Sequence, residues 1–265
     1  MSDEANESWG LAGPYERYGG RWSRKVAGEF LDWLDVPARQ AWGDVGCGTG
    51  ALFDAILARF DPKAVAAIDL SEGFIAAAQR RIQDPRIRLE VGDATALPWP
   101  SRSSDVTVSG LVLNFVSDAA AMAKEMARVT RPGGRVAAYV WDYPRGMQMM
   151  QHFWHVAFKL DSNHSVLDLA EQNPLCRPEP LAALFRAAGL GLVSVRIIEI
   201  PTVFRDFDDY WRPFLGKQGV APTYLASLDL KNRNRIRDAL KARLVPAANG
   251  SIALTARAWA VMGTV

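Results

Sequence analysis

The chain has 265 residues, of which 49% are hydrophobic and 23% are charged, and its formal net charge at pH 7 is +2. This composition excludes an intrinsically disordered chain, and the length suffices for a sizeable hydrophobic core. The near-neutral charge gives no electrostatic reason to expect nucleic acid or an anionic membrane as a partner.

The cysteines and the first residues bear on the compartment. Cys47 and Cys176 are the two cysteines, far apart in the sequence, so we expect neither a disulfide framework nor a metal cluster. The first residues are polar and acidic, whereas a signal peptide is basic and then apolar, and no run approaches the ~20 apolar residues of a membrane span. We therefore expect a cytoplasmic protein without a metal.

Residues 1–36 are predicted to form an N-terminal arm that ends in a helix. Apolar residues recur at helical spacing over 26–34, just before a proline. Tyr18, Arg21 and Trp22 do not fit that apolar stripe cleanly, so they are candidates for contact with a ligand. The alternative is that the aromatic side chains of the arm simply pack on the core.

A glycine-rich turn follows the first expected strand. Gly46, Gly48 and Gly50 stand at alternate positions, with Cys47 between the first two and Asp44 two residues before them. Residues without Cβ let the backbone bend sharply and let a ligand lie against it, and the N–H groups at the start of the next helix can receive oxygen atoms. The turn predicts a site for a nucleotide-like cofactor.

The glycine turn alone does not select the cofactor. An alanine follows the last glycine, so the segment also matches the dinucleotide pattern Gly-x-Gly-x-x-Ala and leaves a nicotinamide cofactor open. Asp44 favours a ligand with a cationic group, because a carboxylate faces an ammonium better than a pyrophosphate. Asp69 ends the next apolar run at the spacing expected for a ribose ligand, and Asp93 and Ala94 follow the third run.

From residue 40 onwards, short strands alternate with amphipathic helices. The expected strands are 40–45, 65–69, 87–91, 106–113, 135–141, 193–203 and 252–261. Such alternation predicts an α/β fold with a doubly wound, mostly parallel, seven-stranded sheet and a ligand at the carboxyl ends of its strands. We expect 1–265 to form a single domain.

Two segments interrupt the alternation and are rich in Met, Phe, Trp and Tyr. They are 142–176, which is helical in part, and 204–248, which includes a basic helix. Both follow strands on or near the ligand side, so we expect helical cap inserts on the substrate side that form an apolar pocket. A core-packing role for most of these side chains is an equally good reading.

The segments Asp-Val-Gly-Cys-Gly-Thr-Gly, Ile-Asp-Leu-Ser, Gly-Asp-Ala and Arg-Pro-Gly-Gly stand in one order along the chain. In order and spacing they resemble the class I S-adenosylmethionine-dependent methyltransferases, particularly their small-molecule group, over residues 40–142. The resemblance implies a Rossmann-like methyltransferase fold with strand order 3-2-1-4-5-7-6, in which the last strand is antiparallel. It also implies S-adenosyl-L-methionine as cofactor and a small-molecule methyl acceptor.

The resemblance further implies roles for the candidate cofactor residues. Asp69 binds the ribose hydroxyls beside Leu70, and Asp93 and Ala94 receive the adenine. The N-terminal arm closes over the cofactor. The expected cofactor-binding residues are Tyr18, Arg21, Trp22, Asp44, Gly46, Cys47, Gly48, Gly50, Asp69, Leu70, Asp93, Ala94, Ser109, Gly110 and Leu111.

Methyl transfer needs little from the protein beyond positioning, because the sulfonium is already activated. A base is required only where the acceptor must lose a proton of high pKa. The candidates for that base are Asp142, Tyr143, His152, His155 and Tyr210, with Asp208 and Asp209 beside the last. For each of them a solvated or structurally satisfied side chain is the competing interpretation.

Three other functions remain open. The basic helix carries Lys231, Arg233, Arg235, Arg237, Lys241 and Arg243, which keeps an RNA- or tRNA-directed methyltransferase as an alternative, although a solvated helix face is favoured. A cofactor-binding protein without turnover is the second alternative, and a NAD-dependent oxidoreductase is the third. The expected function is methyl transfer to a small, apolar or aromatic metabolite, by positioning and exclusion of water.

Overall fold

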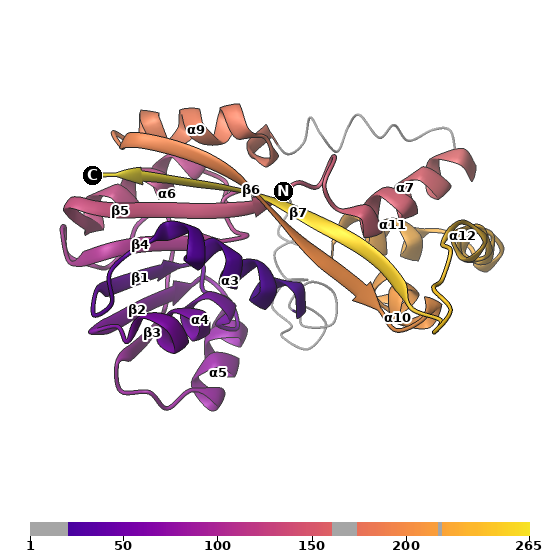
Figure 1. Cartoon of the computed structure of the whole chain (residues 1–265), viewed down its shortest axis with the longest axis horizontal. Helices are drawn as coiled ribbons and strands as arrows, with labels where there is room; N and C mark the ends of the chain where they lie inside the picture. The colour runs from indigo at the N-terminus through magenta and orange to yellow at the C-terminus, as the bar shows by residue number, and fades with distance from the viewer. Residues whose placement is uncertain (1–20, 161–173, 217–218) are drawn as a thin grey trace.

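The computed structural model describes residues 21–160, 174–216 and 219–265. Within these residues seven strands form one sheet, in the order β3-β2-β1-β4-β5-β7-β6. The strands are β1 (Ala41–Val45), β2 (Ala64–Asp69), β3 (Ile87–Val91), β4 (Ser104–Gly110), β5 (Thr130–Trp141), β6 (Gly191–Phe204) and β7 (Ile252–Thr264). β1 to β5 pair in parallel, and β7 runs antiparallel between β5 and β6. The predicted fold class and strand order are confirmed (Figure 1).

Helices cover both faces of the sheet. α3 (Arg21–Leu34), α4 (Ala51–Phe60) and α5 (Glu72–Arg81) pack into one hydrophobic core, and α6 (Ala119–Val129) and α9 (Pro178–Ala187) pack into the other. Along β5, Tyr139 and Trp141 belong to the first core, whereas Ala138 and Val140 belong to the second. A strand that is buried on both faces is expected to have a continuous run of apolar residues, and the sequence of β5 shows this pattern.

Several strand boundaries differ from the prediction, among them the end of β4 and the start of β5. β4 ends at Gly110 rather than at residue 113, because Leu111 has a φ of 65° and leaves the extended conformation. The N–H of Leu111 then donates to the carbonyl oxygen of Tyr139 at 2.8 Å. β5 begins earlier than predicted, at Thr130, which pairs with Ser104. The apolar side chains beyond Gly110 therefore belong to a loop at the carboxyl edge of the sheet.

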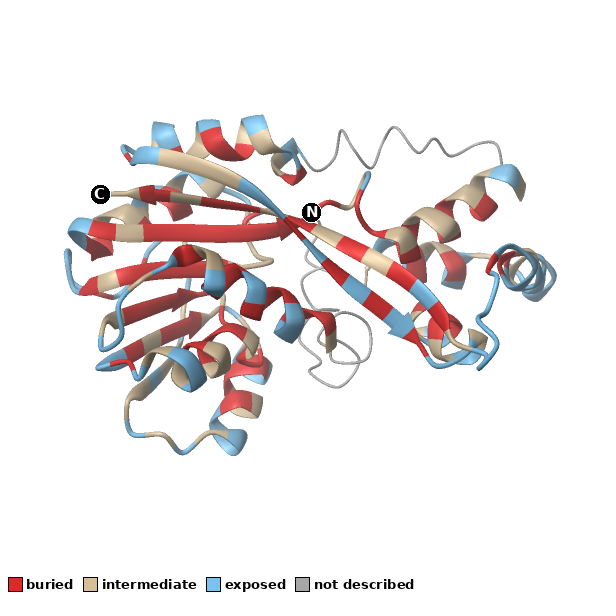
Figure 2. Ribbon diagram, viewed as in Figure 1, coloured by how far each residue is buried: buried red, intermediate tan, exposed pale blue. Residues whose placement is uncertain are grey.

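β6 and β7 extend as a two-stranded ribbon beyond the other strands, and this ribbon carries a second group of helices (Figure 1). We call these helices, together with the distal part of the ribbon, the cap lobe. They are α7 (Gln148–Leu160), α10 (Phe207–Trp211), the 3-10 turn η3 (Arg212–Leu215), α11 (Val220–Ser227) and α12 (Leu230–Arg243). The short turn η2 (Pro174–Cys176) precedes α9. Buried and exposed residues alternate along the ribbon, since one of its faces packs against the lobe (Figure 2).

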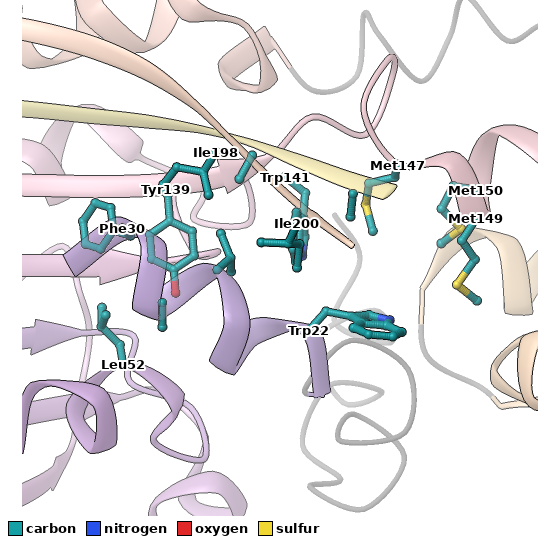
Figure 3. Packing of buried hydrophobic residues seen from close by; sticks show 14 of the residues in the cluster. Trp22, Phe30, Leu52, Tyr139, Trp141, Met147, Met149, Met150, Ile198 and Ile200 are labelled. Carbon is teal, nitrogen blue, oxygen red and sulfur yellow. The ribbon is translucent and has the colours of Figure 1, made fainter. Parts of the chain in front are cut away.

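Aromatic side chains form the core of the cap lobe. Phe153 of α7 stacks on Phe214 with ring centroids 4.6 Å apart, and Trp154 packs against Tyr224 at 5.4 Å. Figure 3 shows the same cluster continuing past Met149 and Met150 to Trp22 at the start of α3. Many of the aromatic side chains of the two inserts are therefore packing residues of the lobe.

No described helix combines the length and the apolarity that crossing a membrane requires. The described residues also contain no group of three or more His, Cys, Asp or Glu side chains arranged to hold a metal ion.

Candidate functional site

A cavity of about 420 Å³ lies at the carboxyl ends of the central strands. Its lining comes from the segments that follow β1, β2, β3 and β4, with contributions from α3, α5 and β5. This is the position at which open α/β sheets bind ligands, because neighbouring loops diverge there. The volume lies within the range of small-molecule and cofactor sites.

The glycine turn after β1 forms one wall of this cavity. The N–H groups of Gly46 and Cys47 both donate to the carbonyl oxygen of Ile68, at 2.8 and 2.9 Å, which ties the turn to the end of β2. A Cβ at Gly46 would lie 2.4 Å from Val112, whereas a Cβ at Gly48 would meet nothing within 4 Å. Gly48 lines the cavity with a φ of 55°, so its missing side chain leaves the space that a ligand would fill.

The carboxylate of Asp69 is fixed at the tip of β2. Its Oδ2 accepts a hydrogen bond from the Gly48 N–H at 2.8 Å, and its Oδ1 accepts one from the Ser71 N–H at 2.9 Å. Each carboxylate oxygen can accept a second bond. Burial raises the pKa of Asp69, while these two backbone hydrogen bonds lower it. The side chain is positioned to accept hydrogen bonds from a pair of hydroxyl groups.

Asp44 is fully buried at the end of β1, and among the described residues neither of its carboxylate oxygens has a hydrogen-bond partner. Burial, and then the negative charge of Asp69, raise the pKa of Asp44 to about 8, against a smaller lowering by the nearby Phe53 backbone N–H, which does not reach hydrogen-bond geometry. A buried carboxylate without a partner is costly. Since Asp44 lines the cavity, a bound cation would supply the missing partner.

The end of β3 and the residue after β2 provide the remaining predicted contacts. Asp93 and Ala94 both line the cavity, and Asp93 Oδ1 accepts a hydrogen bond from the Thr95 N–H at 2.8 Å. Leu70 lines it as well, although 62% of this leucine is exposed. An exposed leucine beside a cavity offers an apolar surface for a flat ring.

The cavity does not include every predicted cofactor residue. Cys47, Gly110 and Leu111 line it, whereas Ser109 is fully buried and its hydroxyl donates to the Val45 carbonyl oxygen at 2.7 Å. Gly50 does not line it either. Burial raises the pKa of the Cys47 thiol well above its ordinary value, so this thiol stays protonated near neutral pH and is a poor nucleophile.

Two of the N-terminal candidates, Arg21 and Trp22, lie where the start of α3 meets the cap lobe. Tyr18 lies outside the described residues. The Arg21 guanidinium contacts Asp209 of α10 at 3.1 Å and stacks on the rings of Trp22 and Phe204. Neither Arg21 nor Trp22 lines the described cavity, but the next residue of α3, Ser23, does.

Two of the candidate bases follow β5 and take part in packing. Asp142 is 2% exposed; its Oδ2 lies 2.7 Å from Nη2 of Arg257, and its Oδ1 accepts a hydrogen bond from the Arg145 N–H. The Tyr143 ring meets Phe115 edge to face at 6.4 Å. Neither residue lines the described cavity.

The other candidate bases belong to the cap lobe. His152 Nδ1 accepts a hydrogen bond from Arg243 at 2.9 Å, and burial followed by nearby positive charges lowers the pKa values of His152 and His155. The Tyr210 hydroxyl is fully buried and donates to the Met149 carbonyl oxygen at 2.9 Å. Asp208 is exposed. None of these side chains lines the described cavity.

The prediction from the sequence did not include the loop after β4 in the site. Val112, Asn114, Phe115, Val116 and Ser117 all line the cavity, yet the prediction placed 112 and 113 in a strand and assigned none of the later residues a role in the site. The signal available in the sequence was an aromatic residue, Phe115, just before the predicted helix cap, and the structure leaves 36% of it exposed.

S-adenosyl-L-methionine fits the groups that the cavity presents. Asp44 is a buried carboxylate that lacks a partner, and Gly48 leaves space open beside it. The paired carboxylate of Asp69 suits ribose hydroxyls, and Asp93 with Leu70 suits an adenine. An ammonium or sulfonium charge, a diol and a flat ring are the three parts of this cofactor.

Comparison with known proteins identifies the family. A family model described as a methyltransferase domain matches residues 43–138. The chain is 34% identical over 176 residues to a demethylmenaquinone methyltransferase of Beutenbergia cavernae, covering 63% of this chain and 72% of that protein. It is also 30% identical over 193 residues to an uncharacterized 37.1 kDa protein in transposon TN4556 of Streptomyces fradiae, covering 69% of this chain. The chain spans about half, 52%, of that relative's length.

Solved structures agree in fold. Phosphoethanolamine N-methyltransferase 2 of Haemonchus contortus, in complex with S-adenosyl-L-methionine, superposes with a TM-score of 0.59 at 16% identity, covering 96% of this chain and 57% of that one. At this identity the likeness concerns the fold alone, whereas the 34% identity to a methyltransferase concerns the family. The chain therefore belongs to the small-molecule group of the class I S-adenosylmethionine-dependent methyltransferases, and S-adenosyl-L-methionine is its cofactor.

Proposed function

We propose that this methyltransferase acts on a small, apolar aromatic acceptor. The observation that carries the proposal is the character of the cavity beyond β4, where Val112, Phe115 and Val116 line it. The ring of Tyr143 supports Phe115 from the side. An apolar wall with an aromatic side chain favours an acceptor that buries a ring.

The chain's own residues bind and orient the reactants. Asp44 neutralises a positive charge of the cofactor, Asp69 accepts from its hydroxyls, and Asp93 lies at the end expected for its ring. When bound, the cofactor supplies a methyl group on an activated sulfonium. The wall beyond β4 holds the acceptor against that group and excludes water, and such positioning accounts for much of the acceleration in reactions of this kind.

The relatives support a ring-bearing acceptor. The Beutenbergia cavernae protein is named for demethylmenaquinone, which is a quinone, and a nocamycin O-methyltransferase of Saccharothrix syringae is 33% identical over 132 residues, which is 48% of this chain. We propose an acceptor of comparable apolar, cyclic character.

Turnover is the direct test. Purified protein is incubated with S-adenosyl-L-methionine and either a short-chain demethylmenaquinone kept reduced, a panel of phenols, or transfer RNA. The proposal expects S-adenosylhomocysteine and a product heavier by one methyl group from at least one ring acceptor. Turnover with transfer RNA alone would contradict the proposal, and absence of any turnover would favour a cofactor-binding protein without activity.

The geometry of α12 weakens the RNA-directed alternative. Arg233 donates to the carbonyl oxygens of Leu228 and Ala226, and Arg237 pairs with Asp238. Arg243 donates to His152. These cations are engaged within their own lobe, and α12 lies at the outer end of that lobe, away from the ends of β1 and β2 (Figure 1). A solvated helix face is the better account.

We also propose that residues 1–36 act as an arm over the cofactor, within a single domain that spans 1–265. Ser23 of α3 lines the cavity, which supports this role for the arm. Cys47 and Cys176 are free thiols, which supports a cytoplasmic location.

A further inference from the structure

The side-chain amide of Asn114 is buried and has no hydrogen-bond partner among the described residues. Neither its Nδ2 nor its Oδ1 makes a hydrogen bond to any of them, although both atoms are shielded from solvent. Asn114 lies in the loop after β4 and lines the cavity. An unpaired buried donor and acceptor destabilise the folded chain, so the amide calls for a partner, and its place on the cavity makes a bound ligand a suitable one.

The order of the strands fixes which part of a ligand Asn114 meets. Asp93 follows β3, Asp69 ends β2 and Gly48 follows β1, and these strands are neighbours in the order β3-β2-β1-β4. A cofactor whose ring, ribose and cationic tail follow that order would occupy the part of the cavity at the ends of β3, β2 and β1. The loop after β4, which carries Asn114, then lies at the end left for the acceptor.

Within the loop after β4, the amide of Asn114 stands among apolar neighbours. Val112, Phe115 and Val116 offer only apolar side chains to the cavity, and Ser117 is exposed. An amide offers one acceptor and two donors. A ring hydroxyl can donate to Oδ1, and a ring carbonyl or phenolic oxygen can accept from Nδ2.

We infer that Asn114 binds an oxygen substituent on the ring of the methyl acceptor, and so selects hydroxylated or carbonyl-bearing aromatics over hydrocarbons. This inference rests on the proposed function, because it presumes a ring in the apolar end of the cavity. The amide orients the ring and sets which of its atoms faces the cofactor. A binding site built to hydrogen-bond a hydroxyl rejects the analogue that lacks it, because the amide is then left unpaired.

A binding experiment tests this without turnover. The protein saturated with S-adenosylhomocysteine is titrated with 1-naphthol and with naphthalene, and ligand-observed NMR gives the dissociation constants. Wild-type protein is expected to bind 1-naphthol about tenfold more tightly than naphthalene, the ratio that one hydrogen bond of ordinary strength gives. In Asn114→Leu the ratio is expected to fall close to one.

Asn234→Leu is the matched control, because Asn234 is an exposed amide on α12. It is expected to keep the tenfold ratio. Asn114→Ala provides a second variant should the leucine variant fail to fold, and an unchanged affinity for S-adenosylhomocysteine shows that the cofactor site is intact.

The outcomes separate the inference from the proposed function. If wild type and Asn114→Leu prefer 1-naphthol to the same extent, or if wild type binds the two rings equally, the role of Asn114 is refuted while a ring-binding cavity stands. If wild type binds neither ring, the proposed acceptor class falls and the inference falls with it.

Discussion

The N–H of Gly48 donates a 2.8 Å hydrogen bond to Oδ2 of Asp69, which joins the glycine turn after β1 to the carboxylate at the tip of β2. The Ser71 N–H fixes the other oxygen of the same carboxylate. The carboxylate is therefore oriented before a ligand arrives, and little ordering is left for cofactor binding to achieve.

Asp69→Ala is expected to weaken S-adenosylhomocysteine binding by about 2 kcal/mol, roughly 30-fold, because a pair of charge-assisted hydrogen bonds to the ribose is lost. Isothermal titration calorimetry measures the change. Asp229→Ala is the control, since Asp229 Oδ1 accepts the Asn232 N–H at 2.7 Å at the start of α12, far along the chain from the cavity. Equal affinities in wild type and Asp69→Ala would refute the assigned role.

Gly48→Ala is expected to lower cofactor affinity while the fold remains intact. Its new Cβ meets no atom of the described residues within 4 Å, and Gly48 lines the cavity. Gly133→Ala is a matched control, since Gly133 also has a positive φ, 75°, and nothing within 4 Å of its Cβ position. Both variants carry a similar backbone strain of about 1 kcal/mol. Similar losses of cofactor affinity in the two variants would show that strain, and not occupancy of the cavity, is responsible.

Asp44 should make the stability of the cofactor-free protein depend on pH. Its pKa of about 8 in the folded state exceeds the ordinary value of 3.8, so the folded protein keeps a proton that the unfolded chain has lost. Stability contributed by this protonated side chain therefore falls as pH rises from about 4 to 8, and the decline levels off above that.

Asp44→Asn removes this dependence and should raise the midpoint of thermal unfolding at pH 8.5, by about 2–4 °C for each kcal/mol recovered. The same variant should bind S-adenosylhomocysteine more weakly, because a neutral amide attracts the ligand's ammonium group less strongly than a carboxylate does. Differential scanning calorimetry at pH 5 and pH 8.5 checks the first effect. If the unfolding midpoints of wild type and Asp44→Asn change equally between pH 5 and pH 8.5, Asp44 is not the source of the pH dependence.

Asp142 and Arg257 should act as a structural pair. Asp142→Ala leaves the half-buried Arg257 guanidinium without its partner, so the free energy of unfolding should fall, and the double variant with Arg257→Ala should cost less than the two single variants summed. A coupling of about 1 kcal/mol is expected, discounted for the partial exposure of the arginine. Urea unfolding of the four proteins measures it. Additive losses, together with a turnover defect confined to Asp142→Ala, would instead favour a role as base.

The sequence was sufficient for the sheet, and many of the residues that it proposed for the cofactor line the cavity, because both depend on local signals. Strand-end acids such as Asp69 and a turn that needs glycine at residue 46 are recognisable from neighbouring residues. Long-range packing was not recognisable in this way. Asp142 resembles a free carboxylate until β7 brings Arg257 against it, and Tyr210 resembles a free phenol until α7 brings the Met149 carbonyl.

The loop after β4 was missed for a related reason. Whether a strand continues past Gly110 is decided by the left-handed backbone of Leu111, which a non-glycine residue does not signal. The loop that follows places Asn114 and Phe115 at the cavity wall. Many of the aromatic residues of the inserts are instead buried in the core of the cap lobe.

A crystal structure with S-adenosylhomocysteine bound is the measurement that tests the central claim most directly. It should show the adenine beside Asp93, the ribose hydroxyls on Asp69, the amino group at Asp44 and the sulfur on the side of the cavity that holds Asn114. A nucleoside bound elsewhere, or one lying in the cavity with its adenine at the loop after β4, would contradict the account.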